Sequence, residues 1–252
     1  MAGGKMLKKY FSITLALLFF ALLWHWFSLL VGRPFLPGPV LALDALISLA
    51  SGGRLFGHVW ASLSRVLWAL LASAIPAIAL GLAAGRCPRM DSFISPVVYL
   101  LHPLPKPAFL PIIMLFLGLG EAAKIFLVAF IIFSQILVTM RDAAKQVPEE
   151  LLESVRSLGA GRVGLFIHVV VPAVLPGFFT ALRISLGTAV AVLFLAETFA
   201  SQSGLGNLIM DAWSRLAFAE MYATILALSI LGLLLFAALD VLEAFFCPWK
   251  KG

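Results

Sequence analysis

The sequence predicts an all-α polytopic membrane protein with about six transmembrane helices. Of its 252 residues, 62% are hydrophobic and only 12% are charged, and its mean hydropathy is +1.08. Soluble domains are about 45–50% apolar, and a water-soluble fold could not bury this much apolar surface. At about 20 residues per crossing, we expect one membrane domain over residues 1–252 and no large second domain.

Six apolar runs are each long enough to cross a hydrocarbon core of about 30 Å. The first follows a short basic segment, but it is longer than the apolar part of a signal peptide and has no small-residue cleavage pattern after it. The predicted spans are Tyr10–Val31, Ala61–Ala84, Phe93–Leu119, Ala122–Met140, Pro176–Ala196 and Met221–Phe246.

Lysine and arginine are distributed unevenly over the segments that join these spans. If the N-terminus is cytoplasmic, most of them fall on the cytoplasmic side, as the positive-inside rule requires. We therefore expect a multi-pass protein of the bacterial cytoplasmic (inner) membrane, with both termini and the 141–171 segment inside. The net charge of +6 is dispersed at helix ends, without the aromatic-interleaved basic patch of a nucleic-acid-binding protein.

The third predicted span is rich in proline, and its prolines lie on both sides of Lys106. Each proline removes a backbone donor, so this span cannot be a straight helix. Irregular backbone at membrane depth is stable only where it packs in protein or lines a wet cavity. The segment is therefore either a broken span that faces the bundle interior, or a short interfacial helix followed by a loop.

Four charged residues lie in or beside the spans, where a charge at mid-bilayer costs at least about 2.5–3.5 kcal/mol. Arg183 and Arg65 are long enough to extend to the cytoplasmic and outer faces respectively, and Glu197 could cap or pair with a neighbouring span. Lys106, Arg183 and Glu197 are also our candidates for a translocation path, in which the cations would attract an anionic solute.

The most polar stretch of the chain lies between the fourth and fifth spans. Pro148 suits a first helical position, two glutamates follow it, and Gly159 suits the left-handed position after a helix C-terminus. These signals predict a short helix over Pro148–Leu158. Its apolar residues recur at helical spacing, namely Leu151, Leu152, Val155 and Leu158. Such a helix could rest on lipid headgroups or dock on another protein.

The spacing in this stretch resembles the EAA loop of the permeases of binding-protein-dependent ABC importers. Glu153, then Gly159 six positions later, and the run 169–172 after nine more residues match that pattern, with Ser154 and Val155 in place of its two alanines. The runs 166–172, 196–198 and 203–206 also resemble the nitrate, sulfonate and taurine branch. The resemblance implies an ATPase-docking coupling loop that includes Pro148, Glu149, Glu150, Glu153, Ser154, Arg156, Ser157, Leu158, Gly159, Ala160 and Pro172.

The resemblance implies a type I importer permease with a N-terminal span and outer loop in 1–58 and a core in 59–246, including a coupling loop at 141–172. It implies a cytoplasmic ABC ATPase dimer, a second permease copy in a homodimer or heterodimer, and an extracytoplasmic solute-binding protein as partners. The solute would be small and anionic, such as a sulfonate, taurine or nitrate. ATP binding would move the coupling loop and switch the spans between inward-open and outward-open states.

The sequence contains no P-loop, so ATP would be bound by the partner subunit. No histidine and cysteine cluster has metal-ligand spacing, and no catalytic triad is apparent, so we expect neither a cofactor nor enzymatic activity. The alternative is a secondary carrier or an integral membrane enzyme without an ATPase partner. A carrier often shows related halves with paired broken helices, and an enzyme shows clustered polar residues in its spans.

Overall fold

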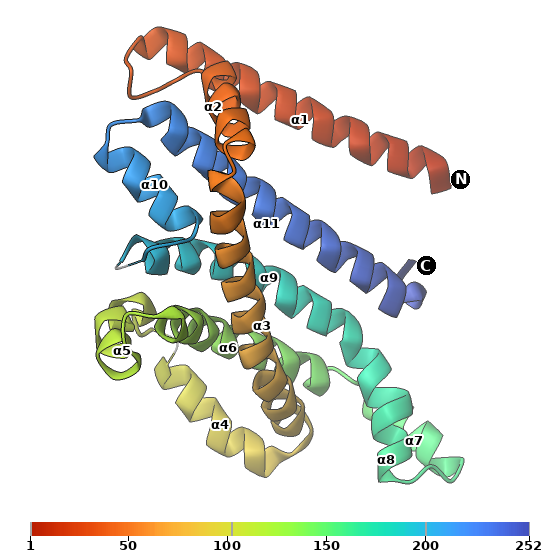
Figure 1. Cartoon of the computed structure of the whole chain (residues 1–252). Helices are drawn as coiled ribbons and strands as arrows, with labels where there is room; N and C mark the ends of the chain where they lie inside the picture. Colours follow the sequence, from red (N-terminus) through yellow and green to blue (C-terminus); the bar gives the residue numbers. More distant parts are fainter. Residues whose placement is uncertain (1, 102, 200, 252) are drawn as a thin grey trace.

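The structure is a computed structural model that describes residues 2–101, 103–199 and 201–251. Throughout these residues the chain forms helices and connecting turns, with no strand (Figure 1). In chain order the elements are α1 (Ala2–Val31), α2 (Pro39–Ser51), α3 (Arg54–Arg86), α4 (Pro88–Leu101), η1 (Lys106–Phe109), α5 (Leu110–Leu117), α6 (Glu121–Lys145), α7 (Glu149–Ser157), α8 (Arg162–Leu165), η2 (Phe166–Val170), α9 (Val171–Thr198), α10 (Leu205–Ser214), α11 (Phe218–Phe246) and η3 (Pro248–Lys251).

The predicted count of about six spans is confirmed. Five helical stretches, which include α1, α3, α6, α9 and α11, are long and apolar enough to cross a membrane. α4 together with η1 and α5, which are bent by 82° relative to each other, is the sixth candidate. The prolines of the third predicted span thus coincide with a sharp bend, which fits both the broken span and the interfacial helix followed by a loop.

Two helices, α2 and α10, lie outside the six predicted spans. α2 has 13 residues and begins at Pro39, directly after Gly38, as proline at a first helical position favours. Thirteen residues span only about 20 Å, too short to cross a bilayer. α10 begins after Gly204, which has a φ of 108°, so the chain turns back sharply after α9. Short apolar runs carry no periodicity signal that separates them from loops inside a hydrophobic sequence.

The most extensive helix pair in the bundle is α3 against α6. Gly81 and Gly85, one turn apart on α3, allow this close approach. A Cβ atom at Gly81 would lie 2.8 Å from the carbonyl oxygen of Leu137, and one at Gly85 would lie 2.5 Å from the Cβ of Ala144. Such a pair of glycines, four residues apart, lets two membrane helices bring their backbones together without side chains between them.

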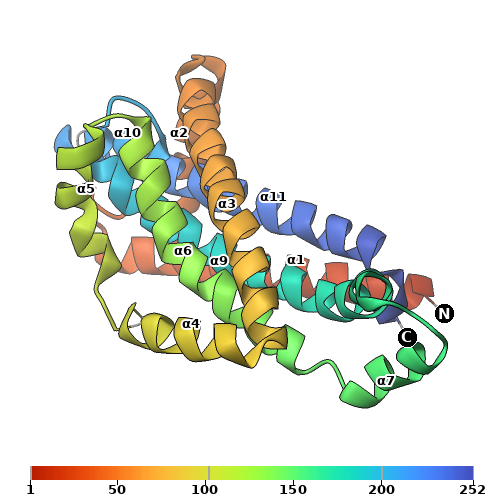
Figure 2. The same cartoon turned by 90° about the horizontal axis from the view of Figure 1, so that it is seen from below.

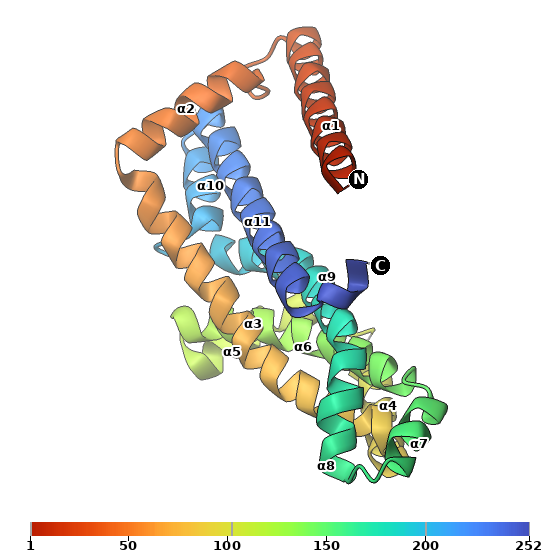
Figure 3. The same ribbon diagram turned by 90° about the vertical axis from the view of Figure 1, so that its right-hand side faces the viewer.

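The two ends of the bundle differ in the elements that they carry. Both termini lie at the same end as α7 and α8, while α5, α10 and the α1–α2 connection lie at the opposite end (Figures 1 and 2). α1 stands apart from the rest of the bundle (Figure 3). The C-terminal half of α1 contacts α11 through Trp24, which stacks on Tyr222 with a 5.7 Å separation of the ring centroids. The indole N–H of Trp24 also donates to the Pro37 carbonyl at 3.0 Å.

We predict that Gly85→Ala lowers the free energy of unfolding by about 1–3 kcal/mol, since the added methyl group overpacks a contact that cannot open. The control is Gly57→Ala on the same helix, where no atom lies within 4 Å of the added Cβ. Thermal unfolding of the detergent-purified protein measures both variants. Equal melting temperatures for Gly85→Ala and the native chain would show that α3 and α6 are not closely packed.

Candidate functional site

The polar segment between α6 and α9 is shorter than predicted at its start. Residues 141–145 form the last turn of α6, and the chain leaves that helix at Gln146. It then forms α7 and α8, and passes into α9 through η2, a π-helical turn over Phe166–Val170. Within the predicted loop 141–172, the connection between the two long helices thus occupies residues 146–170.

The predicted short helix is present as α7, with its start one residue later than expected. Pro148 is the N-cap, with an extended backbone at φ −61° and ψ 136°, rather than the first helical residue. Glu149 and Glu150 form the first turn, where carboxylates are stabilised by the positive end of the helix dipole. The ring of Pro148 disfavours a helical backbone at the preceding Val147, so the helix cannot begin earlier.

The apolar residues of α7 do not share one buried face, which corrects the expectation of a single apolar stripe. Leu152 is 3% exposed, whereas Leu151 is 45% exposed and Leu158 is 85% exposed. Val155 is half-buried. The helix therefore packs one side against the chain and presents two leucines outward, together with the exposed side chains of Glu153, Ser154, Arg156 and Ser157.

Gly159 has the left-handed conformation that the sequence predicted, with φ at +87°. It ends the turn after α7, where its N–H donates to the carbonyl of Arg156 at 3.0 Å. No atom lies within 4 Å of a Cβ built on Gly159 or on Gly161. The bend between α7 and α8, which also contains Ala160, is thus open and leaves space for another surface.

The run 169–172, which is the second part of the EAA-like spacing, lies where this segment enters α9. Val169 and Val170 are 6% and 4% exposed and pack into the main core, and Pro172 stands in the first turn of α9. A proline here is compatible with the helix because the π-turn before it already interrupts the regular hydrogen-bond pattern. This half of the motif anchors the segment, while α7 carries its exposed part.

Two groups of ion pairs lie at the end of the bundle that carries α7, and we call their residues, Arg86, Asp91, Arg141, Lys145 and Glu149, the loop-side cluster. Arg86 of α3 bonds to Glu149 at 3.1 Å and to the Val147 carbonyl at 3.5 Å. Asp91 of α4 accepts from Arg141 and from Lys145, both on α6. Displacing α7 therefore pulls directly on α3, while the bonds of Asp91 hold α4 against α6.

A second group of charges lies at the opposite end, and we call Arg65, Glu121, Lys124 and Glu197 the far-end cluster. Arg65 is 1% exposed, so the expectation that its side chain reaches the outer face is wrong. Its guanidinium bonds to Glu121 of α6 through Nε and Nη2 and to Glu197 of α9 through Nη1 at 2.6 Å. Lys124 donates to Ser201 at 2.9 Å.

Glu197 also fixes the start of α10, which confirms that it pairs with and caps its neighbours. It accepts from Ser62 of α3 at 2.8 Å and from the backbone N–H of Gly206 at 2.8 Å. A Cβ at Gly204 would overlap both the Glu197 carboxylate and the Arg65 guanidinium. Glycine is therefore required in this turn by its left-handed φ and by the buried charges beneath it.

The other two path candidates differ in how their charges are compensated. Arg183 of α9 is neutralised by Asp240 and by Glu243, both on α11, with a 2.6 Å bond to Glu243. Lys106 is 8% exposed, and its ammonium donates to Ser134 of α6 at 2.8 Å. Among the described residues, Lys106 has no carboxylate within salt-bridge distance.

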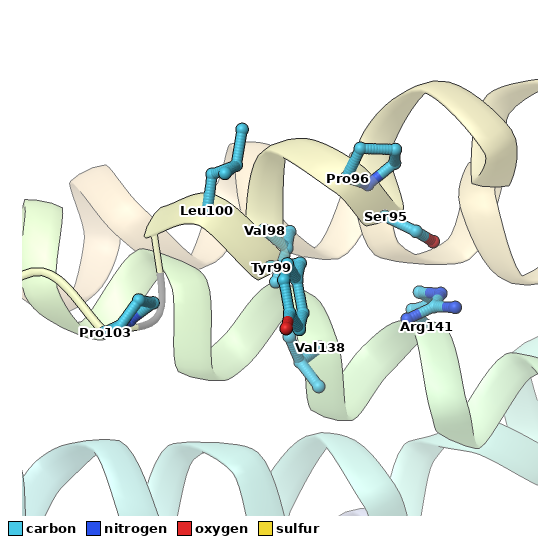
Figure 4. A pocket seen from close by; sticks show the side chains of 8 residues that line it. All are labelled: Ser95, Pro96, Val98, Tyr99, Leu100, Pro103, Val138 and Arg141. Carbon is cyan, nitrogen blue, oxygen red and sulfur yellow. The ribbon is translucent and has the colours of Figure 1, made fainter.

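A cavity of about 780 Å³ opens between α4 and the second half of α6 (Figure 4). Tyr99 extends from α4 toward Val138 of α6, and Arg141 lies near Ser95 at one end. Its lining residues are Ser95, Pro96, Val98, Tyr99, Leu100, Pro103, Val138 and Arg141. Since Arg141 is already bound to Asp91, this largely apolar cavity offers an anion no unpaired cation.

Comparison with known proteins identifies the type of molecule. The family model of the binding-protein-dependent transport system inner membrane component matches residues 77–251. The chain belongs to this family. The match covers α6, the whole polar segment and α9–α11. It confirms the resemblance drawn from the spacing of Glu153, Gly159 and Pro172.

Individual relatives of this permease are transport permeases by name. The taurine transport system permease protein TauC of Escherichia coli is 32% identical over 225 residues, covering 87% of this chain and 82% of TauC. The putative aliphatic sulfonates transport permease protein SsuC of Bacillus subtilis is 29% identical over 221 residues, covering 88% of this chain and 80% of SsuC. The formylaminopyrimidine transport permease protein ThiX of Halalkalibacterium halodurans is 29% identical over 239 residues, covering 94% and 95%.

The permease is thus a multi-pass inner-membrane transport component and not an enzyme. Sequence reasoning located the exposed part of the polar segment and the buried carboxylate Glu197. It missed the loop-side cluster and the Arg65–Glu121 pair, because the partners are separated by 50 residues or more in the sequence. Helical spacing alone carries no signal for such distant pairs. Gly81 and Gly85, four residues apart, are a local signal that could have predicted the contact between α3 and α6.

We predict that Glu197→Gln destabilises the permease by about 3–5 kcal/mol, the usual effect of removing one partner from a buried ion pair. The substitution keeps the shape of the side chain but leaves the buried Arg65 with less counter-charge. Unfolding by titration with dodecyl sulfate measures the change. The control is Glu220→Gln, which removes a carboxylate from an exposed pair with Arg215 and should leave the midpoint unaltered. Matching midpoints for both variants would refute a stabilising role for Glu197.

Proposed function

We propose that this permease forms the translocation path for a small anionic solute and couples it to a separate ATPase through α7. The observation that supports the proposal is the outward face of α7, in the segment whose spacing resembles the family's coupling loop. Leu158 is 85% exposed, and the adjoining bend at Gly159 is open. The start of the same helix is tied to α3 through Arg86 and Glu149. A partner bound to α7 could therefore move the spans.

We infer the orientation of the permease in the membrane from the distribution of its lysine and arginine residues. The loop-side end carries the cationic residues of α6 and α3 that the positive-inside rule places in the cytoplasm. We propose that both termini and α7 are cytoplasmic, where an ATPase would reach them.

Cysteine labelling of intact cells tests this orientation. In a Cys87→Ser background, which removes the exposed native thiol, we expect Gln146→Cys to react with a membrane-impermeant reagent only after the cells are opened. Labelling of Gln146→Cys from outside in intact cells would reverse the orientation.

Gly159 tests the coupling role, because it combines a left-handed backbone with a free surface. We predict that Gly159→Val reduces co-purification of the ATPase about tenfold, since a left-handed residue with a branched side chain costs about 1–3 kcal/mol. Abundance of the permease in the membrane should stay near normal, because no atom of this chain lies within 4 Å of the added Cβ.

The matched control is Gly161→Val, two residues away, which is equally open but has no positive φ. It should retain more ATPase than Gly159→Val. Full assembly and full solute-stimulated ATP hydrolysis by Gly159→Val would defeat the coupling proposal. Transport by the permease without any ATPase would favour the alternative of a secondary carrier.

For the path itself we propose Lys106 as the residue that contacts the solute. Arg183 and Glu197, our other two candidates, have their charges compensated by neighbouring helices. Lys106 lies at the break of the third span, and only a hydroxyl accepts from its ammonium among the described residues. An ammonium has three N–H donors, so Lys106 can still donate hydrogen bonds to an anion at this bend.

We predict that Lys106→Met raises the KM for an anionic solute about tenfold, since a hydrogen bond to a charged group is worth about 1.5–3 kcal/mol. Protein abundance should be unchanged, because methionine retains the apolar stem. Uptake by proteoliposomes is the measurement, with Arg89→Met, which removes an exposed positive charge outside both clusters and the proposed path, as control. An unaltered KM in Lys106→Met excludes Lys106 from the path.

We propose a small sulfonate as the solute and a second copy of the chain, a dimeric ATPase and an external binding protein as partners. The names of TauC and SsuC support a sulfonate, whereas ThiX carries the name of a different compound. Uptake assays with taurine and formylaminopyrimidine in parallel would separate these substrates. Uptake of formylaminopyrimidine alone would overturn the sulfonate proposal.

A further inference from the structure

The far-end cluster combines buried cations with one exposed carboxylate. Arg65 and Lys124 have side chains that are 1% and 2% exposed, and that of Glu197 is 0% exposed. The side chain of Glu121 is 58% exposed. Three of the four charges are therefore fixed inside the bundle, and the fourth covers them from the solvent side.

Glu121 occupies the edge of Arg65 that is best suited to an external anion. Its two carboxylate oxygens bond to Nε and Nη2 of the guanidinium. This fork is the geometry in which arginine binds carboxylates and other oxyanions with two parallel hydrogen bonds. The other donor, Nη1, is held by Glu197 and by the Ser203 carbonyl. Removing Glu121 would expose a preformed oxyanion-binding fork while the rest of Arg65 stayed in place.

Two neighbouring groups would add to the attraction for an anion at this position. The ammonium of Lys124 lies 3.9 Å from a Glu121 oxygen and is oriented by Ser201. Glu121 is also the first residue of α6, and Gly120, the N-cap, provides no side-chain hydrogen bond. The free N–H groups and the dipole of a 25-residue helix favour negative charge there. Without Glu121, one carboxylate would remain against two cations.

We propose that Arg65 and Lys124 form a binding site for a small sulfonate or carboxylate anion, in which Glu121 is an exchangeable occupant. An arriving anion takes the position of the Glu121 carboxylate, and that side chain swings into solvent. This inference rests on the proposed function, because an anion-binding site at the end opposite α7 (Figure 2) would lie where an external solute enters.

The test measures equilibrium binding of radiolabelled methanesulfonate to the full-length chain in lipid-free detergent, at an ionic strength held constant with chloride. The absence of lipid ensures that the ligand is the free anion and not a lipid headgroup. We expect Glu121→Gln to bind methanesulfonate about tenfold more tightly than the native chain, because a tethered competitor has been removed. The control Glu220→Gln, in an exposed ion pair at the same end, should bind as the native chain does.

Lys124→Gln in the native chain provides a second measurement, which does not depend on the folding of Glu121→Gln. It should weaken methanesulfonate binding about tenfold. The same substitution in the Glu121→Gln background should weaken binding by the same factor. Affinity that is the same in the native chain, Glu121→Gln and Lys124→Gln would overturn the proposal. Neither residue contacts α7, so ATPase docking reports on the coupling role independently of this result.

Discussion

The close contact between α3 and α6 is the constraint on which the rest of the bundle depends. Gly81 and Gly85 bring the two backbones together, and each helix carries charges from both clusters. Arg65 and Arg86 on α3 lie about 32 Å apart along the helix axis, at 1.5 Å per residue. A single rigid pair of helices thus connects the exposed α7 with the charges at the opposite end. Movement at one end is transmitted because interfaces of this density deform little.

Charge burial explains the positions of the shorter elements. An unpaired charge in the membrane interior is expensive, so every buried cation of the far-end cluster has partners from at least one other element. Glu197 binds α3 and the start of α10 at once, which holds the turn at Gly204 in place. Arg183 connects α9 to α11 in the same manner, through its ion pairs with Asp240 and Glu243. Lys106 differs from these residues because no carboxylate of the described residues lies within salt-bridge distance of its ammonium, and for that reason it is the most suitable path residue.

The sequence was sufficient for the parts of the fold that depend on local signals. Apolar length located the candidate spans, proline predicted the irregular third segment, and glycine at 159 predicted a left-handed turn, and the structure has each of these features. It was not sufficient where distant residues decide the outcome. The burial of Arg65 depends on Glu121 and Glu197, and the outward position of Leu158 depends on how α7 packs against the core. Helical periodicity places the leucines of α7 on a helix but does not say which of them another helix covers.

We propose α7 as the surface on which a separate ATPase docks. Photo-cross-linking tests it most directly, with p-benzoylphenylalanine introduced at Leu158 and, as control, at Leu115. Both leucines are 85% exposed, but Leu115 lies on α5, at the opposite end of the bundle from α7 (Figure 1). We predict a cross-linked product with the ATPase from position 158 and none from position 115. A product from position 115 without one from position 158 would contradict docking of the ATPase on α7.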